Sequence, residues 1–104
     1  MSGYEERCRA DARLAILAEL ARQSDATLSS RSLAPFIEQI VPRRPSEWLD
    51  AQLVWLAEMG AVNISRSSIA GLGNVIIATL TAMGRNHVER RAPIPGVSMP
   101  VDEA

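Results

Sequence analysis

The chain contains no lysine, one cysteine and one histidine. Cys8 alone cannot form a disulfide within the chain, which excludes a disulfide-stapled fold and fits a reducing compartment. No set of Cys, His, Asp and Glu residues has the spacing of a zinc site, so we expect neither a metal nor another cofactor. All the basic residues are arginine, a bias that by itself specifies no partner.

Long apolar runs are missing as well. No stretch approaches the roughly 18 apolar residues that a membrane span requires, and residues 1–8 lack the basic start and apolar run of a secretion signal. We therefore expect a soluble cytoplasmic protein with no membrane partner. The formal net charge of −1 gives no bulk attraction toward nucleic acid, so any such affinity must come from locally clustered arginines.

The 104 residues, 47% of them hydrophobic, are enough for one modest core and too few for two. We expect one folded domain over residues 1–91, followed by an extended tail over residues 92–104. Pro93, Pro95 and Pro100 prevent the tail from forming a helix or pairing continuously as a strand.

Helical periodicity predicts two helices in the first 41 residues. The first runs from Glu5 to Arg22. The second lies within residues 28–41, and its predicted buried side is Leu33, Phe36, Ile37 and Ile40. Ser32 is preferred to Ser29 as its N-cap, because the later start places Pro35 in the first turn, where no backbone N–H is needed.

A third helix is predicted from Ser46, as N-cap, to Met59. It follows a stiff basic turn, Pro-Arg-Arg-Pro at residues 42–45, and Gly60 is its expected stop.

After Gly60 the periodicity changes to β-branched runs at residues 62–64 and 75–80, which predict two strands. The expected loop between them, residues 65–73, has permissive backbone at Gly71 and Gly73. Thr81 is placed to cap a short fourth helix that ends near Arg90. The predicted fold is therefore α+β and mostly α: a winged helix-turn-helix with three helices, a β-hairpin wing, a short C-terminal helix and an extended tail.

Two resemblances bear on this fold. The segment QLVWLAEMGAV resembles the recognition-helix signature of ArsR-like winged helix regulators. The matching positions are Leu53, Leu56, Glu58, Gly60 and Val62. Residues 13–100 also resemble a family of small proteins of Mu-like bacteriophages and prophages, often labelled ArsR-like transcriptional regulators, in the pieces RLAIL, LVWLAEMGAV, IIATLTAMG and PGVSMP.

The resemblance implies a winged helix protein of a Mu-like phage, located in the cytoplasm of a bacterial host. Its regulatory label rests on analogy of fold and carries little functional weight. Ala61 stands where ArsR-like proteins usually have leucine, and their metal-sensing cysteines have no counterpart beyond Cys8. The resemblance therefore does not imply metal sensing.

In a helix-turn-helix protein the exposed N-terminal residues of the third helix face the bases in the major groove. Here these residues include Ser46, Glu47 and Asp50. The two carboxylates oppose the phosphate field, and neither the arginine–guanine nor the asparagine–adenine pairing is available from these positions. An alternative role for both carboxylates is to complement the positive end of the helix dipole.

Arginines around this helix are the candidates for phosphate contacts. Arg43, Arg44 and Arg66, with Arg31 beside them, could contact phosphates on both sides of a groove. Alternatively, they could be solvated or pair with nearby acidic residues.

Trp48 and Trp55 lie seven residues apart and so fall on one side of the third helix. Both fit core packing, and Trp48 is also a candidate anchor for a protein partner. His87 lacks neighbours with metal-ligand spacing and is expected at the surface. The serines at residues 65, 67 and 68 have no nearby base, so we predict no catalytic site and no enzyme activity.

The leading hypothesis is a DNA-binding protein that contacts double-stranded DNA mainly through phosphates. The alternative is an adapter in phage development or assembly that kept the fold and binds another phage or host protein. A homodimer through the first and last helices would use Leu14, Ile16 and Val88. If the tail folds back instead, its Ile94, Val97 and Met99 would cover these positions.

Overall fold

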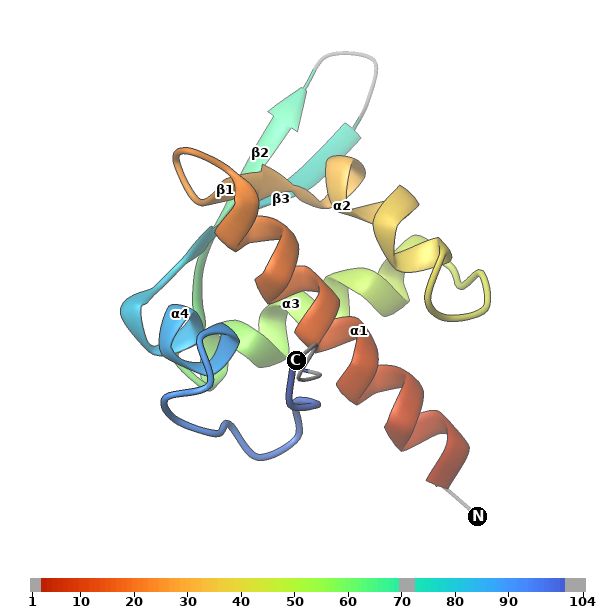
Figure 1. Ribbon diagram of the computed structural model, residues 1–104. Helices are drawn as coiled ribbons and strands as arrows, with labels where there is room; N and C mark the ends of the chain where they lie inside the picture. Colours follow the sequence, from red (N-terminus) through yellow and green to blue (C-terminus); the bar gives the residue numbers. More distant parts are fainter. Residues whose placement is uncertain (1–2, 70–72, 101–104) are drawn as a thin grey trace.

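The computed structural model describes residues 3–69 and 73–100, which form an α+β domain with more helix than strand (Figure 1). Within these residues there are four helices and three strands. In chain order they are α1 (Gly3–Arg22), β1 (Thr27–Ser29), α2 (Ser30–Glu38), α3 (Ser46–Glu58), β2 (Val62–Ile69), β3 (Gly73–Leu80) and α4 (Ala82–Val88).

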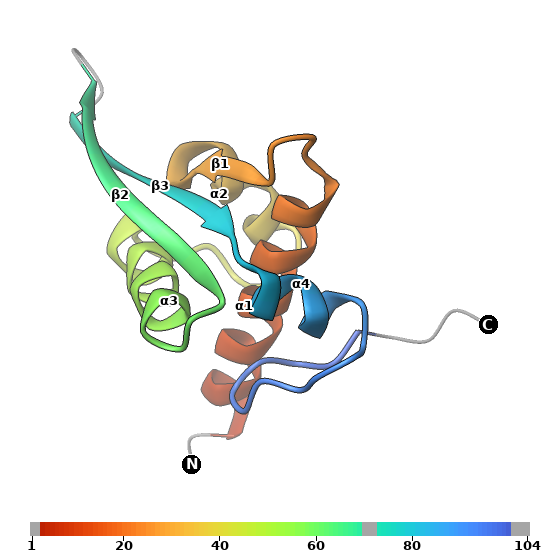
Figure 2. The same ribbon diagram turned by 90° about the vertical axis from the view of Figure 1, so that its left-hand side faces the viewer.

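The three strands form one antiparallel sheet in the order β1-β3-β2. Strands β2 and β3 pair over their whole length, from Val62 opposite Leu80 to Ile69 opposite Gly73. The far end of this hairpin projects beyond the helices (Figure 2). The expectation of a loop over residues 65–73 is wrong for residues 65–69, which continue β2; Gly71 lies outside the described residues, and Gly73 has the expected positive φ, 72°.

Strand β1 was not predicted, because three residues are too few to show a period of two. It pairs with the central strand from Thr27 opposite Thr79 to Ser29 opposite Ile77, and the hydroxyl groups of the two threonines lie 2.9 Å apart. Its position accounts for the start of α2. Pairing with β3 keeps Ser29 extended, with φ −84° and ψ 161°, so the helix can begin only after it.

The predicted N-cap of α2, Ser32, is therefore wrong. Ser29 caps the helix, and its hydroxyl accepts the Ser32 backbone N–H at 3.2 Å. Pro35 then lies inside α2 on its exposed side, where it has no backbone N–H to donate to the preceding turn. Leu33 and Ile37 are buried as predicted, but Phe36 and Ile40 are 39% and 52% exposed, because Phe36 turns away from the core and Ile40 lies beyond the helix end.

Helix α3 begins differently from the prediction and ends as predicted. Pro45, not Ser46, is its N-cap residue, and no side chain bonds to the first backbone N–H groups. At the other end Gly60 adopts φ 86°. The Ala61 N–H donates to the Leu56 carbonyl at 2.9 Å, and the Gly60 N–H donates to Ala57 at 3.0 Å, which is the Schellman pattern of a glycine stop.

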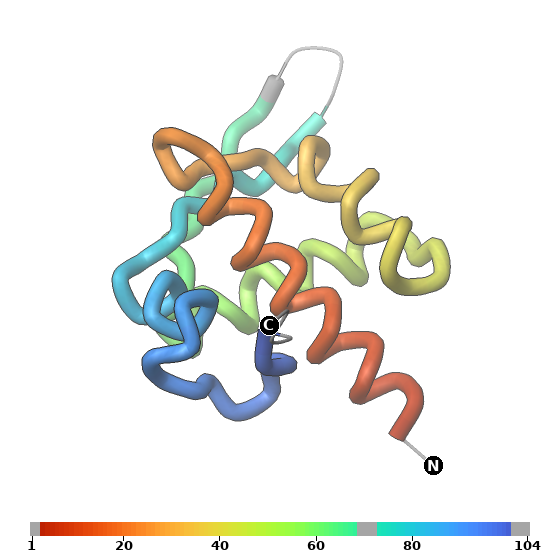
Figure 3. The backbone as a smooth tube through the Cα atoms, viewed as in Figure 1, coloured from red at the N-terminus to blue at the C-terminus, as the bar shows by residue number. Residues whose placement is uncertain are grey.

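The core lies between α1, the other helices and one face of the sheet. Its fully buried large side chains include Ile16, Leu17, Leu20, Leu33, Leu53, Leu56, Val62 and Ile76. Ile16 was a candidate for an exposed dimer contact, and that expectation is wrong. The chain after α4 returns alongside α1 (Figure 3) and adds Ile94 and Val97 to the core, at 4% and 8% exposure, whereas Met99 stays 48% exposed.

Helix α4 is capped by Thr81 as predicted, because its hydroxyl accepts the Gly84 N–H at 3.2 Å. The same hydroxyl donates to the Gly60 carbonyl at 2.6 Å, which ties α4 to the end of α3. The helix ends at Val88, before the predicted Arg90. Gly84 lies inside α4, where glycine is ordinarily unfavourable. Its lack of a side chain allows α4 to pack, because a Cβ there would collide with the Ala61 carbonyl and lie 2.7 Å from Leu80 Cδ1.

We predict that Gly84→Ala lowers the free energy of unfolding by about 1–3 kcal/mol, because the added methyl group meets a backbone carbonyl that cannot move independently. A glycine-to-alanine change inside a helix would otherwise be stabilising. Urea denaturation of the variant and of Gly3→Ala, a helical glycine with open space around it, measures the effect. Equal stability of both variants and the parent would contradict this packing.

We predict that Ile94→Ala lowers the free energy of unfolding by about 2–5 kcal/mol, the usual range for removing a buried isoleucine side chain. Met99→Ala, in the same tail but largely exposed, should change it by less than about 0.5 kcal/mol. Thermal denaturation of both variants makes the comparison. Similar small effects would show that the tail does not contribute to the core.

Candidate functional site

A groove of about 470 Å³ runs between α2, the turn of residues 39–45, the first half of α3 and the start of β3. We call it the turn groove. Its apolar lining includes Ile37, Val41, Leu49 and Val75, all of which are buried. Charged lining residues are Arg31, Glu38, Arg43, Arg44 and Asp50.

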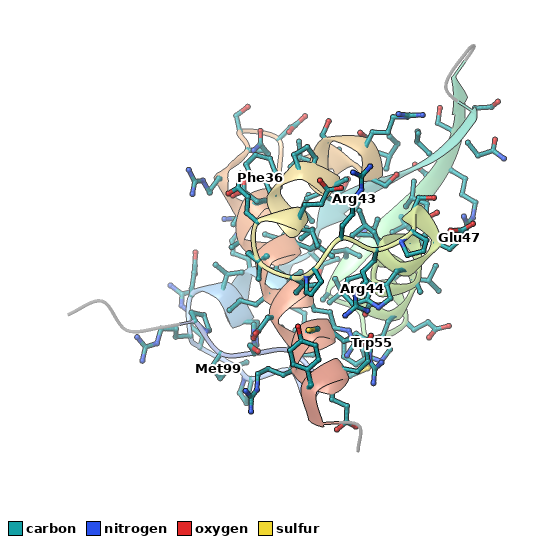
Figure 4. All side chains as sticks on the ribbon, turned by 90° about the vertical axis from the view of Figure 1, so that its right-hand side faces the viewer. Phe36, Arg43, Arg44, Glu47, Trp55 and Met99 are labelled. Carbon is teal, nitrogen blue, oxygen red and sulfur yellow. The ribbon has the colours of Figure 1, made fainter. Side chains whose placement is uncertain are left out.

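Of the six predicted nucleic-acid contacts, the turn groove brings together Arg43, Arg44, Ser46 and Asp50. Glu47 and Arg66 do not line it. The prolines at residues 42 and 45 hold the turn extended, which places the two arginines between them at the start of α3. Arg43, Arg44 and Glu47 lie around this turn, and Met99 lies well away from it (Figure 4).

Arg43 is the open member of the pair. Its side chain is 87% exposed, and its Nε lies 4.0 Å from a carboxylate oxygen of Glu38. An exposed ion pair at this distance contributes little to stability. The guanidinium group can therefore leave Glu38 for another anion with little loss.

Arg44, the next residue, is held in place. Its side chain is 20% exposed, its Nη1 donates to Glu5 Oε2 at 2.9 Å, and its guanidinium group lies 4.8 Å from the centre of the Trp48 ring. The Trp48 indole N–H donates to the same Glu5 oxygen at 3.0 Å, and Arg9 lies 3.5 Å from it. This cluster joins the start of α1 to the start of α3, so Arg44 has a structural role.

The Arg44–Glu5 contact explains two shifted protonation equilibria. Hydrogen bonds from Arg44 and then Trp48 lower the pKa of Glu5 to about 2, and the bond to Glu5 raises the pKa of Arg44. Glu5 lies 39 residues from Arg44, and no spacing in the sequence connects them. Trp48 is half-buried, and the indole N–H, its only polar side-chain group, already donates to Glu5. A partner could therefore contact only the exposed part of its ring.

The start of α3 is acidic and faces one arginine from the sheet. Glu47 is exposed in the first turn, and Asp50 is partly buried. Burial raises the pKa of Asp50, with a contribution from Glu47, while the positive charge of Arg66 opposes the rise. The exposed Arg66 on β2 is therefore close enough to act on the Asp50 carboxylate.

Trp55 belongs to a second arginine stack, on the tail side of α3. The Arg13 guanidinium group lies 3.8 Å from the centre of its ring, donates to Gln52 Oε1 at 2.9 Å and donates to the Gly96 carbonyl at 3.0 Å. Gly96 has φ 92°, and a Cβ there would lie 2.7 Å from two ring carbons of Trp55. The ring thus serves as packing surface for the tail.

The residue types of a hydrolytic triad meet where the tail crosses α1: His87, Ser98 and Asp11. Their hydrogen bonds are not those of a triad. The Ser98 hydroxyl donates to Asp11 Oδ1 at 2.5 Å, and His87 Nε2 donates to the Ser98 backbone carbonyl at 2.9 Å. The imidazole is therefore not bonded to the hydroxyl that it would have to deprotonate. His87 is also fully buried, so its expected place at the surface is wrong, because the tail folds over it.

We predict that Glu5→Gln flattens the pH dependence of stability between pH 4.5 and 2. The unfolded chain takes up a proton at its ordinary pKa of about 4.5, and the folded chain resists until about 2, so acidification favours unfolding in this window. Urea denaturation at several pH values should show the stability difference between parent and variant shrinking toward pH 2. The control is Glu6→Gln, an exposed neighbour; parallel pH profiles of parent and Glu5→Gln would contradict the assignment.

Among the described residues, no group of three or more His, Cys, Asp and Glu side chains is placed to hold a metal ion. No helix in residues 3–69 and 73–100 is long and apolar enough to cross a membrane. No family model, no curated protein and no solved structure matches the chain.

Proposed function

We propose that this chain is a winged helix domain that binds double-stranded DNA, mainly through its phosphates, as a regulator of Mu-like phage type. Three features support the winged helix: the order α1-β1-α2-α3-β2-β3, the sheet order β1-β3-β2, and the projecting β2–β3 hairpin in the place of a wing. A fold alone carries little functional weight, so the proposal depends on the charges around α3.

The observation that carries the proposal is that two exposed arginines, Arg43 and Arg66, both lie near Asp50 in the first half of α3. Arg43 comes from the turn before the helix, and Arg66 comes from β2. Asp50 connects the two positions, because it lines the turn groove with Arg43 and feels the charge of Arg66. Two cations that flank a helix can contact the phosphates on the two sides of a groove.

The charges on helix α3 make base reading by this helix unfavourable, which leaves phosphate contacts from the residues around it. The helix carries Glu47, Asp50 and Glu58 and no basic residue, so its approach to the bases is electrostatically unfavourable. Arg44 adds little, since Glu5 and Trp48 hold it. We therefore expect weak, strongly salt-dependent binding with little sequence preference.

The test is a fluorescence-anisotropy titration of a mixed-sequence duplex at several salt concentrations. The plot of log affinity against log salt has a negative slope, and each lost phosphate contact should make it less steep by about 0.9. Arg43→Ala with Arg66→Ala should therefore reduce the steepness by about twice that amount. The charge-matched control is Arg22→Ala with Arg91→Ala, two exposed arginines whose only ion pairs are to neighbours within their own segments. Equal slopes for both double variants, or no binding at low salt, would contradict the proposal.

The second candidate function is a protein-interaction adapter. The acidic exposed side of α3 and the exposed Phe36 and Ile40 at the end of α2 favour it. An absence of DNA binding at low salt, in a chain that is folded, would make this function the preferred one.

A further inference from the structure

The C-terminal tail is attached to the body through polar contacts on α1 and on α4. On α1, the Ser98 N–H donates to the Ala10 carbonyl at 3.2 Å, and the Ser98 hydroxyl donates to Asp11. On α4, His87 contacts the tail at both of its ring nitrogens. Ile94 and Val97, between these contacts, fill the core, so the bonds to His87 enclose the apolar part of the tail.

The two bonds define the protonation state of His87. The Ile94 backbone N–H donates to Nδ1 at 3.0 Å, and only a nitrogen without a proton can accept it. The Ser98 carbonyl can only accept, so Nε2, 2.9 Å away, must carry the proton. The docked tail therefore requires the neutral imidazole with its proton on Nε2.

A second proton has no favourable place in this arrangement. It would bind Nδ1 and point at the Ile94 N–H, so that two donors would face each other and a positive charge would lie in a fully buried position. On α1 the charged groups bonded to the tail are Asp11, through Ser98, and Arg13, through Gly96. The charged residues on and after α4 are Arg85, Glu89, Arg90 and Arg91.

No compensating charge is in place. Residues 92–100 carry no titratable side chain. Among the described carboxylates, none forms an ion pair with His87. Protonation therefore opposes docking, because the added charge is buried and the proton on Nδ1 faces the Ile94 N–H.

We propose that His87 is a protonation-sensitive latch for the C-terminal tail. The neutral ring holds residues 92–100 against α1 and α3, and protonation releases them while the helices and the sheet stay folded. Release frees Arg13 from the Gly96 carbonyl and uncovers the Trp55 ring and the positions that Ile94 and Val97 fill. The latch changes the α1–α3 surface around Trp55.

The direction of the pH effect follows from proton binding. The released state binds one proton more than the docked state, so release becomes more favourable as pH falls, by up to tenfold per pH unit. Between pH 8 and 5 an imidazole is the side chain that ordinarily titrates, and this chain has only one. Comparison with a variant that lacks the imidazole can therefore assign tail release in that range to His87.

The experiment is NMR on the full chain. The ¹⁵N shifts of the His87 ring at pH 8 should show the proton on Nε2. Hydrogen exchange of the Ile94 and Ser98 amides, corrected for the intrinsic rate at each pH, should lose protection by up to tenfold per unit as pH falls toward 5. The Ala78 amide in the central strand should keep its protection, because the body stays folded.

The matched variant is His87→Gln, whose amide can accept from Ile94 and donate to Ser98 but does not titrate. Its tail amides should keep the same protection from pH 8 to 5. Identical pH profiles of parent and variant would overturn the latch. If the variant does not hold the tail at pH 8, the parent decides: constant protection of Ile94 and Ser98 down to pH 5, or a proton on Nδ1, overturns it.

Discussion

Burial of one face of α1 is the constraint on which the rest of the domain depends. Cys8, Ala12, Ile16, Leu17 and Leu20 lie on this face, and α2, α3, α4 and β3 all contact the helix. The polar edges of the same helix then bond to the loops around it. Glu5 holds the start of α3, and Arg13 and Asp11 hold the tail. Helix α1 thus positions both the apolar core and the polar groups at the surface.

This arrangement divides the arginines near α3 into two classes. Arg13 and Arg44 stack on the two tryptophans and donate to acceptors on other elements, so they link parts of the fold. Arg43, in the turn before α3, and Arg66, on β2, are exposed to solvent. The tryptophans of α3 are therefore supports for structural arginines, and the charge open to a partner is smaller than the number of arginines suggests.

Features that arise from local periodicity were predictable from the sequence, and features that arise from long-range contacts were not. The amphipathic pattern of α1, the glycine stop at Gly60 and the cap at Thr81 are local signals, and all three are present. Strand β1 exists because β3 is available to pair with it, and that pairing moved the start of α2 to Ser30. For the site, the sequence indicated Arg43 and Arg66. It could not show that a hydrogen bond to Glu5 makes Arg44 unavailable to a partner, or that the tail buries His87.

NMR of the arginine side chains distinguishes the held arginines from the exposed ones. Spectra of the Nε–H groups, recorded with and without a short duplex at low salt, report mobility and contact separately for each arginine. We expect rigid signals for Arg13 and Arg44 that do not change when DNA is added. For Arg43 and Arg66 we expect mobile signals that shift and broaden. A shift of Arg44 together with unchanged Arg43 and Arg66 would contradict this distinction.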